Sequence, residues 1–349
     1  MWRINGTDPA TATFDLVGKH LAVTLPGLCP ITKSHVPNLK SNAVLALGSK
    51  LYWAVACFDY IDPDINPDDP DIMHWPTLDR YFNRQRYGVN DTSFIMVSHD
   101  KGETWDLGPS PHAFFKGRLA APRIVNAGQG YRDAPDPAHI YALFPGTTTD
   151  KAFFENNDAI WVGRVPTDEL LDRASWEFFA GMSAGRPTWT ADDTLAQPVL
   201  EHPLMTATQQ ATYHPGLRRY LMAVWSWCDA DGNPRGQLTG ASTGGGVAGY
   251  NTTTDKDVHD RSQLTLWEAE QPWGPWQIFH RDDDWRGPDG SSGGYTPVFP
   301  PAWLNGTTIW MSFTQCCDQP ATPVNHYNYT YQEITLHLTT ETNTGSNSG

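Results

Sequence analysis

The sequence predicts an all-β fold made of many short strands. Aromatic residues, which favour strands, make up 12% of the 349 residues and include 15 Trp. The chain also contains 30 Gly and 28 Pro, which are typical of turns. Apolar runs of strand length alternate with these turn residues, and only residues 167–176 have the pattern of a short helix. Because hairpins dominate and no β-α-β rhythm occurs, we do not expect a parallel α/β sheet.

The predicted strands can be placed one after another by their apolar runs. The first two, 42–47 and 51–56, are separated by Gly48, Ser49 and Lys50 and should form a hairpin. The later runs are bounded by turn residues and cover 92–97, 139–144, 159–164, 219–225, 264–268, 307–313 and 333–338. None of them approaches the ~18 apolar residues of a membrane span. We expect one domain over residues 1–338, followed by a disordered tail at 339–349 that is rich in Thr, Asn, Ser and Gly.

The charge of the chain argues against a nucleic-acid partner. Asp and Glu number 39 and Lys and Arg number 24, which gives a formal net charge of −15. Proteins that bind nucleic acids usually carry a basic patch instead. We therefore expect no nucleic-acid partner. We also expect no membrane partner, because no apolar run is long enough to span one, and we expect a monomer.

Sequons and cysteines favour a secreted glycoprotein. Asparagine occurs in an N-glycosylation sequon at five positions, which are Asn5, Asn90, Asn251, Asn305 and Asn328. The five cysteines lack the spacing of a metal site, and they suit an oxidising compartment, although an odd number leaves at least one unpaired within the chain. No apolar signal-peptide region follows Met1.

One turn indicates how the strands are assembled. It is the segment Ser98-His99-Asp100-Lys101-Gly102-Glu103-Thr104-Trp105, in which Asp and Ser can bond to the backbone and Gly can supply a positive φ. This turn is the Asp box, and it resembles the hairpin turn repeated in sialidase-like β-propellers. The resemblance implies a structural role for Asp100. At ~40–50 residues per blade, and with long insertions at 59–91 and 229–262, we expect a five-bladed propeller.

Several longer segments resemble the propeller family known as domain of unknown function 4185. The resemblance covers residues 40–340, and its segments are 122–126, 157–166, 171–179, 212–220, 266–276 and 299–303. Some members of this family are endo-D-arabinanases, but most have no assigned activity, so the resemblance implies a propeller fold more strongly than it implies a substrate. Relatives carry a further strand and hairpin before the region that matches Phe14 to Leu25. We therefore expect an incomplete first blade and a chain that lacks its natural N-terminal part.

The predicted function is that of a secreted glycoside hydrolase, which acts on a polysaccharide or oligosaccharide and uses two carboxylates at one mouth of the propeller channel. Glycoside cleavage needs two carboxylates, one to protonate the leaving oxygen and one to attack or to activate water. Asp136 and Asp158 each precede a predicted strand, and Glu201 precedes a predicted blade, so these three are the candidate catalytic residues. For each of them, the alternative role is a carboxylate that holds a turn or caps a helix.

Four further residues are candidates for substrate binding, and they open two alternative functions. These residues are Arg123, His202, Tyr213 and His214. A histidine base, with Arg123 holding a uronate carboxylate, would suit a polysaccharide lyase. A propeller that presents Trp platforms without a catalytic pair would bind carbohydrate without cleaving it.

The sequence predicts no cofactor and no metal site. Residues 59–71 contain six Asp, and oxygen ligands at this density could bind calcium. Their spacing is not that of an EF-hand, however, and a solvated acidic loop is the preferred interpretation. The Gly-rich run 240–249 lacks the Lys of a phosphate-binding loop.

Overall fold

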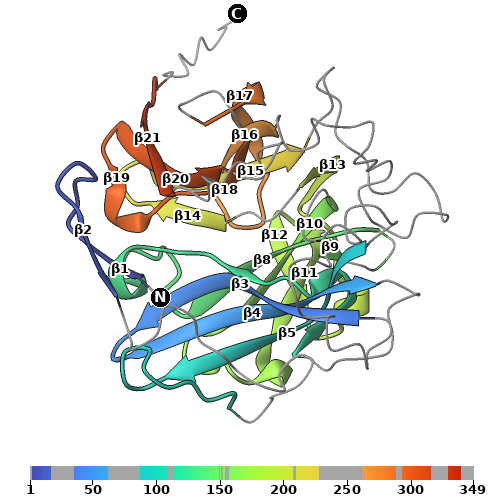
Figure 1. Ribbon diagram of the computed structural model, residues 1–349. Helices are drawn as coiled ribbons and strands as arrows, with labels where there is room; N and C mark the ends of the chain where they lie inside the picture. The colour runs from blue at the N-terminus through green and yellow to red at the C-terminus, as the bar shows by residue number, and fades with distance from the viewer. Residues whose placement is uncertain are drawn as a thin grey trace, which may run out of the picture.

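The fold is described from a computed structural model (Figure 1). It describes residues 2–16, 35–61, 87–108, 114–148, 150, 152–153, 157–206, 210–227, 262–287, 293–315 and 329–338. The insertion predicted at 229–262, most of the one at 59–91 and the tail at 339–349 lie outside these residues. Within the described part of the chain, no helix has the length and apolar character needed to cross a membrane.

Most described strands belong to four antiparallel sheets, and each sheet is called a blade below. The blades follow one another along the chain, except that one short strand of blade 1 lies between two strands of blade 2 in the sequence. Blade 1 contains β3 (His35–Leu47), β4 (Lys50–Ile61), β5 (Tyr87–Ser98), β6 (Phe115–Lys116) and β9 (Ala152–Phe153). Blade 2 contains β7 (Arg123–Ile124), β8 (His139–Gly146), β10 (Asn157–Pro166), β11 (Glu177–Ser183), β12 (Arg186–Thr190) and β13 (Leu200–Thr206). Blade 3 contains β14 (Gln210–His214), β15 (Arg219–Trp227), β16 (Ser262–Ala269) and β17 (Gln277–Trp285). Blade 4 contains β18 (Gly294–Val298), β19 (Leu304–Asn305), β20 (Thr308–Gln315) and β21 (Tyr329–Thr335).

The blades are arranged as in a β-propeller. Their first strands, β3, β7, β14 and β18, contact one another in that order, and each blade extends away from its first strand by antiparallel pairing. A parallel bridge between Asn126 and Thr212 joins the segment after β7 to β14. These four inner strands therefore line a common axis, which confirms the prediction of an all-β propeller.

The described residues form four blades, one fewer than the five predicted. The residues before blade 1 contribute only the hairpin of β1 (Trp2–Asn5) and β2 (Thr13–Leu16). This hairpin contacts blade 4, where the Phe14 ring meets the Tyr329 ring edge-on with centroids 5.5 Å apart. Two strands without further pairing cannot form a blade, so a fifth blade is not present among the described residues.

The predicted helix at 167–176 is wrong except for its last turn. Only a 3-10 turn, η5 (Arg173–Ser175), forms there. The carboxylate of Asp172 accepts a hydrogen bond from the backbone N–H of Ala174 at 2.9 Å. A side chain that bonds to the backbone in this way begins a new turn in the middle of the segment and competes with a continuous helix.

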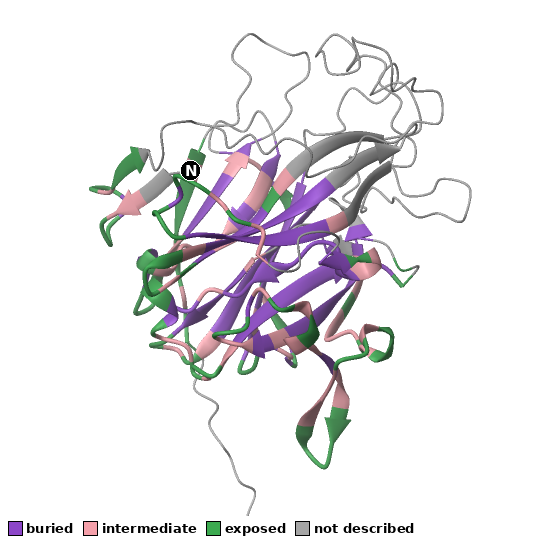
Figure 2. Ribbon diagram, turned by 90° about the horizontal axis from the view of Figure 1, so that it is seen from below, coloured by how far each residue is buried: buried purple, intermediate pink, exposed green. Residues whose placement is uncertain are grey.

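Several of the Trp side chains are buried in the core. Trp161, Trp176, Trp225 and Trp303 are among the largest fully buried side chains. Figure 2 shows buried residues along the strands of the blades and exposed residues at the turns between them. These four side chains therefore belong to the core and are not exposed platforms for sugar rings.

The turn at 98–105 is held by hydrogen bonds to Asp100. Its two carboxylate oxygens accept from the backbone N–H and the hydroxyl of Thr104 at 2.9 and 2.6 Å. The hydroxyl of Ser98 donates to the same carboxylate at 2.8 Å. The Trp105 ring then packs on Trp53, with ring centroids 5.2 Å apart. These contacts tie the turn after β5 to β4, which is a structural role.

We expect Asp100→Ala to lower the melting temperature, and the loss to depend on pH. The hydrogen bonds from Thr104, then that from Ser98, lower the pKa of Asp100 from 3.8 to about 2. A carboxylate whose pKa is lower in the folded than in the unfolded state stabilises the protein at pH values above its unfolded-state pKa. This stabilisation is lost as the pH falls through its folded-state pKa. The difference in melting temperature between wild type and variant should therefore narrow between about pH 4 and pH 2. Glu103→Gln in the same turn is the control, and a constant difference across this range would contradict the expectation.

Candidate active site

The propeller has two distinct ends because its inner strands run in the same direction. We call the end at which β3, β7, β14 and β18 begin the N-terminal mouth, and the end at which they finish the C-terminal mouth. The second strand of each blade returns toward the N-terminal mouth and ends there, as shown by the antiparallel pairing of β7 with β8 and of β14 with β15. The candidate residues can be assigned to one mouth or the other from these registers.

The register of blade 2 separates the three candidate carboxylates. Asp136 lies just before β8 and contacts His139, the first residue of that strand. Asp158 lies at the start of β10, next to Ala159, which pairs with Gly146 at the end of β8 and with Glu201 on β13. Seven residues separate positions 139 and 146, which is about 23 Å along a strand. Asp136 is therefore at the C-terminal mouth, whereas Asp158 and Glu201 are at the N-terminal mouth.

Asp136 is bound by its own neighbours. Its carboxylate accepts a hydrogen bond from the Tyr141 hydroxyl at 2.8 Å and lies 2.9 Å from Nδ1 of His139. Burial alone would raise the pKa of Asp136, but the hydrogen bonds from Tyr141 and His139 outweigh it and hold the pKa below its usual value. Burial, followed by the Asp136 carboxylate, raises the pKa of Tyr141. This arrangement fixes the loop before β8.

Two of the predicted binding residues also lie at the C-terminal mouth, at the end of β14. The buried Tyr213 ring packs on the ring of Tyr220, with centroids 5.0 Å apart. His214 is fully buried, and its Nδ1 accepts a hydrogen bond from the backbone N–H of Leu217 at 3.2 Å. Burial is the main cause that lowers the pKa of His214, so its imidazole is neutral at pH 7.

His202 lies beside Glu201 on β13, at the boundary between blades 2 and 3. Its half-buried ring meets the ring of Trp267 on β16 edge-on, with centroids 5.5 Å apart. Burial, and then the positive charge of Arg281, lower the pKa of His202. A neutral imidazole can accept a proton, which is what a general base must do.

Arg123 lies on the innermost strand of blade 2 and faces the strands around the axis. Its side chain is buried, with 7% of its surface exposed. Nη1 donates to the carbonyl oxygen of Asn42 on β3 at 2.8 Å, and Nε has no acceptor among the described residues. Burial lowers the pKa of Arg123 to about 9, and Tyr295 on β18 is the other group that acts on it. The guanidinium of Arg123 on β7 thus contacts the backbone of β3.

Buried polar side chains also gather at the strand ends of the N-terminal mouth. They come from blades 2, 3 and 4 and are Asn157, Thr206, Ser226, Ser262, Gln263 and Gln315. The strands between the mouths are filled mainly by apolar side chains. A polar interior at one mouth suits a ligand rich in hydroxyl groups better than an apolar ligand.

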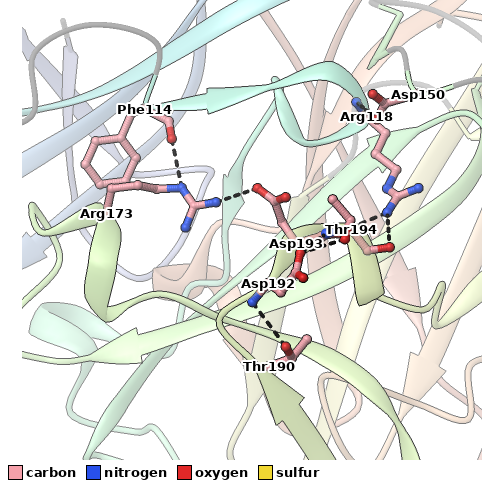
Figure 3. Close-up of polar contacts among 8 residues, drawn as sticks. All are labelled: Phe114, Arg118, Asp150, Arg173, Thr190, Asp192, Asp193 and Thr194. Atoms are coloured by element: carbon pink, nitrogen blue, oxygen red, sulfur yellow. Dashed lines mark hydrogen bonds and ion pairs between the residues drawn. The ribbon is translucent and has the colours of Figure 1, made fainter.

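Two arginines between blades 1 and 2, Arg118 and Arg173, make structural contacts (Figure 3). Nε of Arg173 donates to the carbonyl oxygen of Phe114 at 3.0 Å, and its Nη2 lies 2.6 Å from the carboxylate of Asp193. Arg118 donates to the carbonyl oxygen of Asp193 at 3.0 Å. These contacts hold η6 (Asp193–Leu195) against the end of blade 1, so this group is not a candidate site.

The described residues contain no group of three or more His, Cys, Asp or Glu side chains that could hold a metal ion. Of the acidic segment 59–71, only the backbone of residues 59–61 is described, at the end of β4. Asp283 and Asp284 on β17 form ion pairs with Arg281 and Arg286. The calcium hypothesis for 59–71 stays untested.

Sequence reasoning missed two residues. Asn42 contacts Arg123, and Tyr295 acts on the pKa of Arg123. Asn42 belongs to a strand 81 positions before Arg123, and its side-chain amide is also buried without a partner among the described residues. A polar residue at the start of the predicted strand 42–47 was the only signal in the sequence, and it did not indicate which strand it would meet.

Comparison with known proteins finds only distant likenesses. No protein-family model matches the chain, and no curated protein matches it. A provisionally named hydrolase from Bacteroides ovatus ATCC 8483 is 11% identical with a TM-score of 0.42, and the match covers 86% of this chain and 61% of that one. An endo-arabinase from Bacteroides thetaiotaomicron VPI-5482 is 10% identical with a TM-score of 0.39, over 91% and 80% of the two chains. A levansucrase mutant from B. megaterium is 9% identical with a TM-score of 0.37, over 87% and 86%. The chain thus spans about three fifths of the first of these proteins, and likenesses this distant assign no activity.

Proposed function

We propose that the protein is a glycoside hydrolase that binds its carbohydrate at the N-terminal mouth. The observation that carries the proposal is the register of blade 2, which brings Asp158 and Glu201 to the same end of the propeller. β10, which carries Asp158, is two strands outward from β7, or about 10 Å, and β13, which carries Glu201, is one strand further out, at about 14 Å. The roles of the two carboxylates are those of the acid and of the nucleophile or base in glycoside cleavage.

The register of β10 is interrupted where these two carboxylates lie. The pairing with β13 shifts between Asn157 and Ala159. Such bulges redirect side chains and are common beside active sites. We propose that this shift aims Asp158 toward the mouth, and that Asp136 supports the loop before β8 and takes no part in catalysis.

Two other functions have a specific observation in their favour. His202, beside Glu201 and neutral at pH 7, could act as the base of a lyase on a uronate glycan, with Arg123 holding the carboxylate. The polar mouth by itself would also suit a propeller that binds carbohydrate without cleaving it. Neither alternative uses the pair of carboxylates.

A glycan screen separates these functions. The purified protein is incubated with arabinan, arabinogalactan and uronate-containing polysaccharides, and both reducing ends and unsaturated uronates are measured. We expect new reducing ends without unsaturated products. Absorbance from unsaturated uronates would instead support the lyase, and binding without cleavage would support the carbohydrate-binding propeller.

We propose further that the protein is secreted and belongs to the family of domain of unknown function 4185. We also propose that the hairpin β1–β2 is part of a fifth blade. Cys57 is disulfide-bonded, and the other four cysteines lie outside the described residues. Asn305 of a sequon is exposed in β19, whereas the Asn5 amide donates to Asp15 at 2.7 Å. The contact of Phe14 with blade 4 places β2 beside that blade.

A further inference from the structure

Arg123 is a buried cation without an acidic partner in the described part of the chain. Other arginines of the described residues form ion pairs, and these are Arg132, Arg164, Arg173, Arg219, Arg281 and Arg286. The side chains of those six are at least 22% exposed, whereas Arg123 as a whole residue is 7% exposed. The most buried of these arginines is therefore the one without a carboxylate.

The contacts of Arg123 leave part of its hydrogen-bonding capacity unused. Nη1 donates to the carbonyl oxygen of Asn42, while Nε has no acceptor among the described residues. A guanidinium has five N–H donors, and a buried charge is stable only when it is paired and hydrogen-bonded. Nη1 also donates to the carbonyl oxygen of Ser41 at 3.4 Å, so two carbonyl dipoles orient the group, and neither neutralises its charge.

A second unused polar group lies on the neighbouring strand. The side-chain amide of Asn42 is buried, and neither its nitrogen nor its oxygen has a partner among the described residues. Tyr295 on β18 is the second cause, after burial, that acts on the pKa of Arg123, and its ring packs on that of Trp225 with centroids 4.7 Å apart. β3 and β7 thus each carry a buried polar side chain with unused hydrogen-bonding capacity where the two strands meet, and β18 carries the Tyr295 hydroxyl.

We propose that Arg123 binds the carboxylate of a uronic acid residue in the carbohydrate substrate, with Asn42 and Tyr295 beside it. The planar fork of a guanidinium matches a carboxylate in geometry and charge. One cation suits a singly charged group, whereas a multiply charged anion would face the overall charge of −15 with a single positive partner. This inference rests on the proposed carbohydrate-binding function of the N-terminal mouth.

The test compares acidic and neutral sugars of the same shape. Binding of D-glucuronate and D-galacturonate, and of D-glucose and D-galactose, is measured by titration calorimetry with the full chain. We expect each uronate to bind at least tenfold more tightly than its neutral counterpart, and Arg123→Gln to remove this preference. Arg186→Gln, at an exposed arginine of β12, is the matched control and should leave the preference unchanged.

Two further variants decide the outcome if Arg123→Gln does not fold. Arg123→Lys keeps the charge and loses the fork, and Tyr295→Phe removes one hydroxyl, so each should weaken uronate binding several-fold without abolishing it. Equal binding of uronates and neutral sugars by the wild type would overturn the inference. An unchanged preference for uronates in Arg123→Gln would also overturn it. If that variant does not fold, an unchanged preference in both Arg123→Lys and Tyr295→Phe would have the same consequence. Absence of uronate binding would overturn it as well.

The same data distinguish this inference from the hydrolase proposal. Preferential uronate binding with no cleavage of any glycan would refute the hydrolase and leave the uronate site standing. Cleavage of arabinan together with equal binding of uronates and neutral sugars would refute the uronate site and leave the hydrolase standing.

Discussion

Asp158→Asn is expected to reduce the rate of glycan cleavage by a factor of about 10²–10⁴, the usual contribution of an acid or base catalyst. Asparagine keeps the size of the side chain and its hydrogen-bonding oxygen, but it can neither donate a proton as an acid nor attack as a carboxylate. Glu201→Gln should have an effect of the same order, because both carboxylates are needed for cleavage. The rates are measured as reducing ends released from whichever glycan the screen identifies.

Asp136→Asn is the matched control for this prediction. It makes the same chemical change in the same blade, about 23 Å away along β8. Its contacts to Tyr141 and His139 are structural, so the variant should lose some stability and keep its rate constant. If Asp158→Asn and Glu201→Gln both cleave the glycan at the wild-type rate, the assignment of the catalytic pair is wrong. A loss of rate in Asp136→Asn alone would move the active site to the C-terminal mouth.

Trp176→Ala is expected to lower the free energy of unfolding by about 3–5 kcal/mol, as for other large-to-small changes of a buried aromatic residue. Trp176 is fully buried, and its ring meets Phe115 of blade 1 and Phe144 of blade 2 edge-on, with centroids 5.1 and 6.2 Å away. Its indole N–H donates to the carbonyl oxygen of Leu170 at 3.3 Å. Alanine would leave a cavity between two blades, and this loss is a large fraction of the ~5–15 kcal/mol that stabilises a typical domain.

Urea denaturation measures this effect. Leu195→Ala removes an apolar side chain that is 61% exposed and is the control, with an expected change within about 0.5 kcal/mol. Trp176→Phe should lie between the two, because phenylalanine fills part of the same space. A change below about 1 kcal/mol for Trp176→Ala would show that this residue is not packed between the blades as described.

Local patterns in the sequence predicted the strands and one of the turns. The apolar runs 139–144, 159–164 and 219–225 lie within β8, β10 and β15. The turn at 98–105 follows from Asp100 and its neighbours, because all of its hydrogen bonds join residues at most four positions apart. Interactions of this range are contained in a short segment, so a short segment suffices to predict them.

The sequence could also have predicted that Asp136 and Asp158 lie at opposite mouths of the propeller. Both residues precede predicted strands, and these two strands are consecutive and antiparallel. Residues that precede consecutive antiparallel strands lie at opposite ends of a sheet. The order of the predicted strands therefore already argued against placing both carboxylates at one mouth.

The sequence by itself determined the all-β character, the positions of most strands and the turn at Asp100, because each depends on hydrophobic periodicity or on hydrogen bonds between near neighbours. Only the tertiary structure decided that Arg123 meets Asn42, 81 residues earlier, and that Arg123 has no acid beside it in the described chain. The reason is that blades pack through side chains from strands far apart in sequence. No local pattern specifies which strand will face another across the axis.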